Sequence, residues 1–141
     1  MGGYGAILYG AHLGAQVLAL SPETIMKLPF SKSAKMMPEN ALVVFRDLSA
    51  EIIAARAPIF LISGEMDPVD LLCAEMVKNL LNMHVTTMLM AAHTVVRDLA
   101  FSDRFIPVLS AFLDEEALPE LKDSGNALQV KGYAKIYFNG W

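Results

Sequence analysis

Two polar residues that can exchange protons follow apolar runs in the sequence. Asp67 comes after the run Pro58–Ser63 and a turn at Gly64, and His93 comes after the run Val85–Met90. His93 follows Asp67 by 26 residues, which is enough for one helix and one strand. Both side chains are therefore expected at the carboxyl edge of neighbouring parallel strands, where ligands bind in open α/β sheets. A rigid carboxylate at that edge can hold an imidazole in one tautomer.

Each of these residues also has a plainer interpretation. Asp67 directly precedes Pro68, so it is a standard helix N-cap whose carboxylate accepts the free N–H groups of the first turn. This role is compatible with holding an imidazole. A lone histidine in an apolar stretch is usually a packed core or turn residue, which we expect for His12 and His84. The strand-end position of His93 and its pairing with Asp67 favour a catalytic role instead.

Three short apolar runs and four helical patterns alternate along the chain. The third run is half polar and fits a strand nearer an edge, whereas the first two are apolar on both faces. The order predicts an α/β fold with a parallel sheet and alternating helices. We expect strands at Gln16–Leu20, Pro58–Ser63 and Val85–Met90, and helices at Met1–Gly14, Glu39–Arg56, Pro68–Leu81 and Thr94–Leu113.

The domain organisation follows from the same pattern. Residues 1–113 hold the alternating elements, and residues 114–141 form a tail of uncertain structure. Within the last helical pattern, Pro107 predicts a kink or a restart near Ser102. Residues 23–40 carry scattered lysines and prolines, which is typical of a connecting loop.

Composition leaves two classes of protein open. The 141 residues are 55% apolar and only 18% charged, which fits either a buried half-domain or a bilayer segment. The run Met1–Pro22 has no charged residue and is long enough to span a bilayer. It contains His12 and Gln16, however, and changes character at Gly14. We therefore favour a helix followed by a buried strand, and no integral membrane segment.

Charge and cysteine content exclude several functions. The net charge is −4 and the eleven basic residues are scattered, which argues against nucleic-acid binding. The single Cys73 excludes an intramolecular disulfide framework and suits a reducing compartment, so we expect a cytoplasmic location. The three histidines lack the spacing of a metal site, and Gly2-Gly3-x-Gly5 is no dinucleotide fingerprint. We expect no metal and no cofactor.

The glycine-rich start carries a family resemblance. Small residues Gly2, Ala6, Gly10 and Gly14 recur every fourth position from the start of the first helix. The segment MGGYGAILYGAHLGAQVLALSP resembles the helix and strand behind the nucleophile elbow of bacterial α/β hydrolases. This resemblance implies the second half of an α/β-hydrolase fold. Gly2 would be the last glycine of the G-x-S-x-G elbow, so the serine would directly precede Met1.

The resemblance also implies a reaction, the hydrolysis of a carboxyl ester or related acyl group of a small molecule by the complete protein. Asp67, in the family's G-x-x-D turn, would be the acid and His93 the base of a Ser-His-Asp triad. The backbone N–H of Met1 would supply half of the oxyanion hole, and Gly2 would let its helix pack closely. Ser21, Ser63 and Ser102 do not replace the serine, because none lies in a G-x-S-x-G turn. The residue encoded before Met1 is the decisive check.

Because the chain itself holds no such serine, a second interpretation stays open. The chain would be a non-catalytic, truncated α/β-hydrolase-like interaction module. Its first strand would then expose an unpaired edge, which can pair with another chain. This alternative predicts an oligomer or a heterocomplex.

Overall fold

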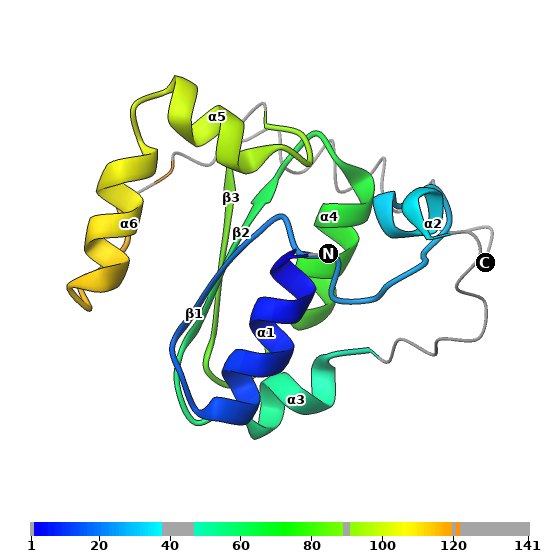
Figure 1. Cartoon of the computed structure of the whole chain (residues 1–141), viewed down its shortest axis with the longest axis horizontal. Helices are drawn as coiled ribbons and strands as arrows, with labels where there is room; N and C mark the ends of the chain where they lie inside the picture. The colour runs from blue at the N-terminus through cyan, green and yellow to red at the C-terminus, as the bar shows by residue number, and fades with distance from the viewer. Residues whose placement is uncertain (1, 38–46, 89–90, 120, 122–141) are drawn as a thin grey trace.

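The chain folds around a short parallel sheet. A computed structural model describes residues 2–37, 47–88, 91–119 and 121 (Figure 1). Within these residues, β1 (Val17–Leu20), β2 (Ile59–Gly64) and β3 (Met83–Met88) form a three-stranded sheet in the order β1-β2-β3. Both strand pairs are parallel. The predicted α/β fold with a parallel sheet is thus confirmed, as is the edge position of the third strand.

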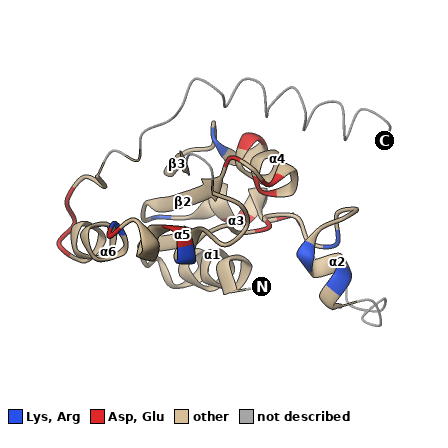
Figure 2. Ribbon diagram, turned by 90° about the horizontal axis from the view of Figure 1, so that it is seen from above, with Lys and Arg blue, Asp and Glu red and all other residues tan. Residues whose placement is uncertain are grey.

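Alternate residues of the strands face two different hydrophobic clusters. In β1 and β2, Val17, Ala19, Ile59 and Leu61 belong to a cluster with buried residues of α1 (Gly2–Leu13), α3 (Ser49–Ala54) and α4 (Pro68–Val77). Ile62 belongs to the other cluster, with buried residues of α5 (Val95–Phe101) and α6 (Phe105–Leu113). Figures 1 and 2 show α6 on the opposite side of the strands from α4. The sheet is therefore covered on both faces, as parallel sheets usually are.

The uncharged N-terminal run is a helix followed by a strand, as the sequence predicts. Gly14, with a φ of 66°, ends α1, and the N–H of the next residue, Ala15, donates to Gly10 O at 3.0 Å. This is a common helix C-terminus, because glycine adopts the left-handed conformation at little cost. Of the helices that the structure describes, none is long and apolar enough to cross a membrane.

Small residues let α1 pack closely, but not at every predicted position. A Cβ at Gly10 would collide with the Val17 side chain, and a Cβ at Gly3 would lie 2.8 Å from Pro22 Cβ. At Gly2 and Gly14 a Cβ would meet no atom of the described residues within 4 Å. Among the described residues, the close contacts of α1 are thus made at Gly3 and Gly10.

Several predicted boundaries differ from the observed ones. The third strand begins two residues earlier than expected, and α4 ends at Val77 rather than Leu81. In the predicted loop, Lys32–Met36 forms the short helix α2, with the Ser31 side chain as its cap. Of the predicted helix Glu39–Arg56, Ser49–Ala54 is helical, while residues 39–46 lie outside the described part.

The last helical pattern forms two helices, as the proline predicts. The break lies between Phe101 and Phe105, so α6 restarts just after Ser102. Pro107 is the third residue of α6. In the first turn of a helix a proline is tolerated, because the N–H that it lacks has no partner within the helix.

Candidate active site

The turn after β2 places two carboxylates at the carboxyl edge of the sheet. Asp67 is the N-cap of α4, and its Oδ1 accepts hydrogen bonds from Val69 N at 2.9 Å and from Asp70 N at 3.2 Å. The sequence-based N-cap assignment is confirmed. Asp70 lies three residues further on, in the first turn of the same helix, and its side chain is completely buried. Residues three apart on a helix lie on the same face, so the two carboxylates are neighbours.

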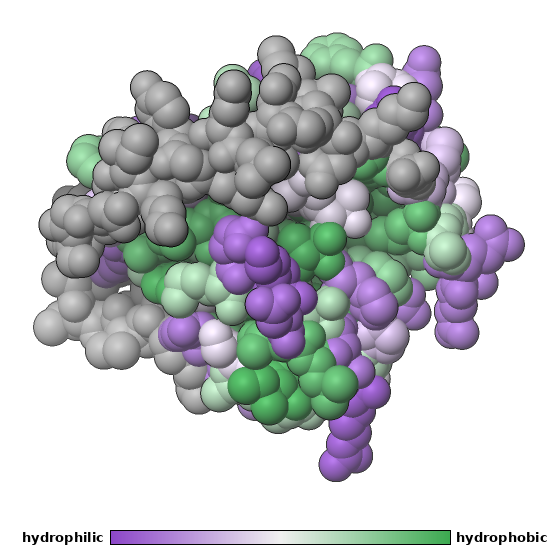
Figure 3. Space-filling model, turned by 180° about the vertical axis from the view of Figure 1, so that it is seen from behind, coloured by the Kyte–Doolittle hydropathy of each residue, from purple (hydrophilic) through white to green (hydrophobic). Residues whose placement is uncertain are grey.

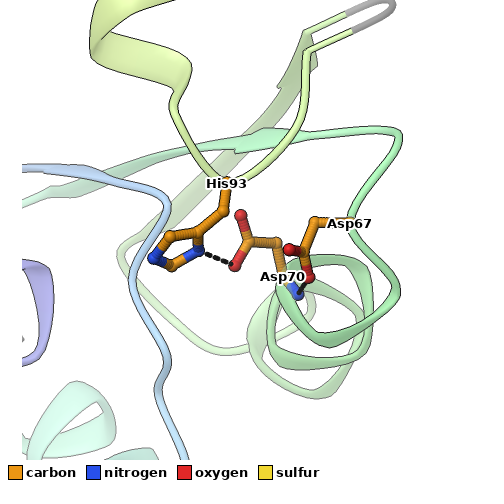
Figure 4. Close-up of side chains that lie close together, drawn as sticks. All are labelled: Asp67, Asp70 and His93. Atoms are coloured by element: carbon orange, nitrogen blue, oxygen red, sulfur yellow. Dashed lines mark hydrogen bonds and ion pairs between the residues drawn. The ribbon is translucent and has the colours of Figure 1, made fainter. Parts of the chain in front are cut away.

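His93 pairs with Asp70. The distance from His93 Nδ1 to Asp70 Oδ1 is 2.8 Å, a hydrogen bond between side chains (Figure 4). The sequence pattern predicts Asp67 as the partner of His93. The structure brings the two close, but the carboxylate that contacts the imidazole is that of Asp70. The reason is that Asp67 Oδ1 faces the free N–H groups of α4, while Asp70 is directed toward the loop that carries His93.

The loop before His93 rests on the turn after β2. Glu65 N donates to Met88 O at 3.1 Å and Met66 N donates to Ala91 O at 2.9 Å. Gly64 makes this contact sterically possible, because a Cβ at this position would collide with the carbonyl oxygens of Ala91 and Ala92. The glycine of the G-x-x-D turn thus permits the close approach of the backbone that positions His93.

Burial and pairing set the ionisation of the two groups. The hydrogen bond to Asp70 raises the pKa of His93 above its ordinary value of 6.5, although burial opposes the shift. Burial raises the pKa of Asp70 above 3.8, and the hydrogen bond from His93 lowers it in part. A charged Asp70 next to a protonated His93 is the combination that the pair stabilises.

Two more carboxylates surround the imidazole. The charges of Asp67 and Glu23 also raise the pKa of His93. Glu23 is 5% exposed, and its carboxylate accepts hydrogen bonds from Lys32 N at 2.8 Å and Ser33 N at 3.2 Å. Backbone N–H groups thus hold both Asp67 and Glu23 in place, so the negative charge around His93 is fixed in position.

The first turn of α1 lies beside this site. Gly3 packs against Pro22, which stands between Ser21 and Glu23 in the segment after β1. That segment lies against α4, the helix that carries Asp70, because Thr24 Oγ1 donates to Cys73 O at 3.4 Å. Figure 4 shows the second ring nitrogen of His93, Nε2, pointing away from Asp70. Met1, the predicted oxyanion-hole residue, lies outside the described part.

Among the residues that the structure describes, one group also has the spacing of a metal site: Asp67, Asp70 and His93. One ligand atom from each lies within 4.8 Å of the others. However, His93 Nδ1 is already hydrogen-bonded to Asp70, and Asp67 Oδ1 to the backbone of α4. The observed contacts are those of a hydrogen-bonded acid–base pair.

Three residues of this site are not predicted from the sequence: Asp70, Ser21 and Glu23. A signal for Asp70 was available, because it is an acidic residue in the first turn of an otherwise apolar helix face. Nothing in the local sequence marks Ser21 or Glu23, whose burial depends on the segment after β1. His12 and His84, expected to be packed core or turn residues, are neither: both are exposed, His12 in the last turn of α1 and His84 in β3. The His84 ring stacks on Phe60 at a centroid distance of 4.8 Å.

Comparison of this chain with models of protein families, with curated proteins and with solved structures found no match in any of the three.

Proposed function

We propose that His93 and Asp70 are the base and the acid of a serine hydrolase that cleaves carboxyl esters or related acyl groups of small molecules. The observation that carries this proposal is the 2.8 Å hydrogen bond between His93 Nδ1 and the buried Asp70. The bond fixes the imidazole with its Nδ1–H toward the carboxylate, which leaves Nε2 as the atom that accepts a proton. This is the arrangement that a serine nucleophile needs.

The proposal places the nucleophile on a serine that directly precedes Met1 in the complete protein. The position of α1 supports it, because Gly3 in the first turn packs on Pro22, next to the residues that surround His93. In the reaction, His93 Nε2 takes the proton from the serine hydroxyl as its oxygen attacks the acyl carbon. The protonated imidazole, stabilised by Asp70, then gives that proton to the leaving group. A water molecule, deprotonated by His93, then attacks the acyl group on the serine and releases it as the carboxylic acid.

The test is fluorophosphonate labelling of the complete protein, extended upstream of Met1. We expect one labelled serine, directly before Met1, and loss of ester hydrolysis in His93→Ala and Asp70→Ala. As the matched control, the 141-residue chain should be neither labelled nor active. A labelled serine elsewhere, or full hydrolysis by the His93→Ala protein, would contradict the proposal.

The second candidate function is a non-catalytic interaction module. The observation that favours it is a set of exposed apolar side chains, among them Phe101 at 81% and Leu113 at 67% exposed in the α5–α6 region. Figure 3 shows hydrophobic surface between hydrophilic side chains on one face of the molecule. This candidate predicts an oligomer in sedimentation velocity that Phe101→Ser or Leu113→Ser dissociates. A monomer at all concentrations would argue against it.

A further inference from the structure

Two buried oxygen atoms at the carboxyl edge of the sheet are unpaired. Neither Ser21 Oγ nor Asp70 Oδ2 has a hydrogen-bond partner among the described residues. Ser21 is 7% exposed and Asp70 is fully buried. Buried polar atoms are nearly always paired in native proteins, so two such atoms in one site call for a physical explanation.

The backbone holds Ser21 in an unusual conformation. Its φ is 45°, in the left-handed region that residues other than glycine rarely adopt. Its N–H donates to Ile62 O at 2.8 Å, and the next residue, Pro22, packs on Gly3. Residues held in such conformations by their surroundings are concentrated at functional sites. These contacts fix Ser21 at the carboxyl edge of the sheet, and three residues further on Thr24 Oγ1 donates to Cys73 O of α4 at 3.4 Å. The segment after β1 therefore lies against α4, and the Ser21 hydroxyl lowers the pKa of Asp70.

We propose that Ser21 is a positioning residue for Asp70, its Oγ–H donating to Oδ2 while His93 Nδ1–H donates to Oδ1. One bond then satisfies both unpaired atoms. With each oxygen engaged by a different donor, the carboxylate cannot rotate, and it stays ionised despite its burial. The result is a chain of three side chains, Ser21–Asp70–His93. Its catalytic purpose rests on the proposed function, whereas the hydrogen bond itself does not.

Ser21 is not suited to be the nucleophile of this site. Its Oγ is buried, and it has no hydrogen bond to His93. A nucleophile must be reached by substrate and must give its proton to the base. Ser21 therefore acts through Asp70.

The test is the pKa of the Asp70 carboxyl, measured by carbon-13 NMR in the 141-residue chain. Ser21→Ala removes the donor, and we expect the Asp70 pKa to rise by about one unit. Ser21→Gly removes the donor and also relieves the left-handed strain, so it provides a folded variant if the alanine variant is unstable. The control is Ser63→Ala, which removes another buried, unpaired hydroxyl.

The expected result is a raised Asp70 pKa in both Ser21 variants and an unchanged pKa in Ser63→Ala. An Asp70 pKa that stays at the wild-type value in Ser21→Gly would overturn the proposal, as would an equal rise in Ser63→Ala. This titration does not depend on ester hydrolysis. A failure to label the serine of the complete protein would therefore leave it unaffected, and the two proposals can fail separately.

Discussion

The polar groups at the two edges of the parallel sheet differ in their hydrogen bonding. At the amino edge, Asn82 has a φ of 63°. Its side-chain Nδ2 donates to Ala55 O at 2.8 Å, and its backbone carbonyl accepts from Ile59 N at 2.8 Å. These two hydrogen bonds stabilise the turn before β3. At the carboxyl edge, Asp70 and Ser21 are buried, and within the described part of the chain neither Asp70 Oδ2 nor Ser21 Oγ has a hydrogen-bond partner.

This difference indicates that the amino edge contributes to stability and that the carboxyl edge holds the candidate site. A paired turn residue such as Asn82 contributes to stability, because its amide satisfies a carbonyl of another segment. Burial of a charged carboxylate such as Asp70 lowers stability, and proteins tend to keep such features at functional sites. Changes at the amino edge should therefore affect folding alone, and changes at the carboxyl edge should also alter His93.

The largest effect is expected at the carboxyl edge, for Gly64→Ala. The new Cβ would collide with the carbonyl oxygens of Ala91 and Ala92, so the loop that carries His93 must move. We expect a loss of about 3 kcal/mol in the free energy of unfolding, measured with urea, and a shifted His93 resonance in NMR spectra. In the control, Gly5→Ala, the Cβ meets only the Tyr9 ring at 4.0 Å. This helical variant should be as stable as the wild type or more stable, by up to about 1 kcal/mol. Equal stability of Gly64→Ala and the wild type would contradict the account.

A smaller effect is expected at the amino edge, for Asn82→Ala. The Ala55 carbonyl loses its donor and alanine adopts the left-handed conformation poorly, so the free energy of unfolding should fall by about 2 kcal/mol. Asn82→Gly removes the same donor without the strain and should lose less. Neither variant should change the pKa of His93 in an NMR titration. A change in that pKa would show that the two edges are not independent.

The smallest effect is a pH dependence of stability that originates at the carboxyl edge. The pKa of His93 is raised in the folded chain, so its contribution is complete below the unfolded value of 6.5. That contribution is lost as the pH rises through the folded pKa. Between pH 6 and 8 the wild type should therefore become less stable as the pH rises. His93→Gln should remove this slope, as measured by urea unfolding at several pH values. An identical slope in the variant would contradict the assignment.

The sequence predicts the fold better than it predicts the site. The order of elements and the parallel sheet follow from alternating patterns that are strong in short apolar runs such as Pro58–Ser63. Boundaries were less accurate where pattern and tertiary contacts disagree. Met83 and His84 join β3 because they pair with β2, although the apolar run begins only at Val85.

The site was predicted in outline, because strand ends follow from the fold. His93 and an acidic residue were expected at one edge, and the structure places them there. The pairing with Asp70 could not be chosen over Asp67, since it depends on where a helix turn directs each carboxylate. Ser21 and Glu23 reach the site only through the course of the segment after β1, which no local pattern describes.

The most direct test of the central claim is the pKa of His93, measured by NMR in the wild type, Asp70→Asn and Asp67→Asn. Asparagine also caps helices, so Asp67→Asn should keep α4 intact. The account predicts a wild-type pKa above 6.5, a clear fall in Asp70→Asn and a smaller fall in Asp67→Asn. If Asp67→Asn lowered the pKa as much as Asp70→Asn or more, Asp70 would not be the partner of His93.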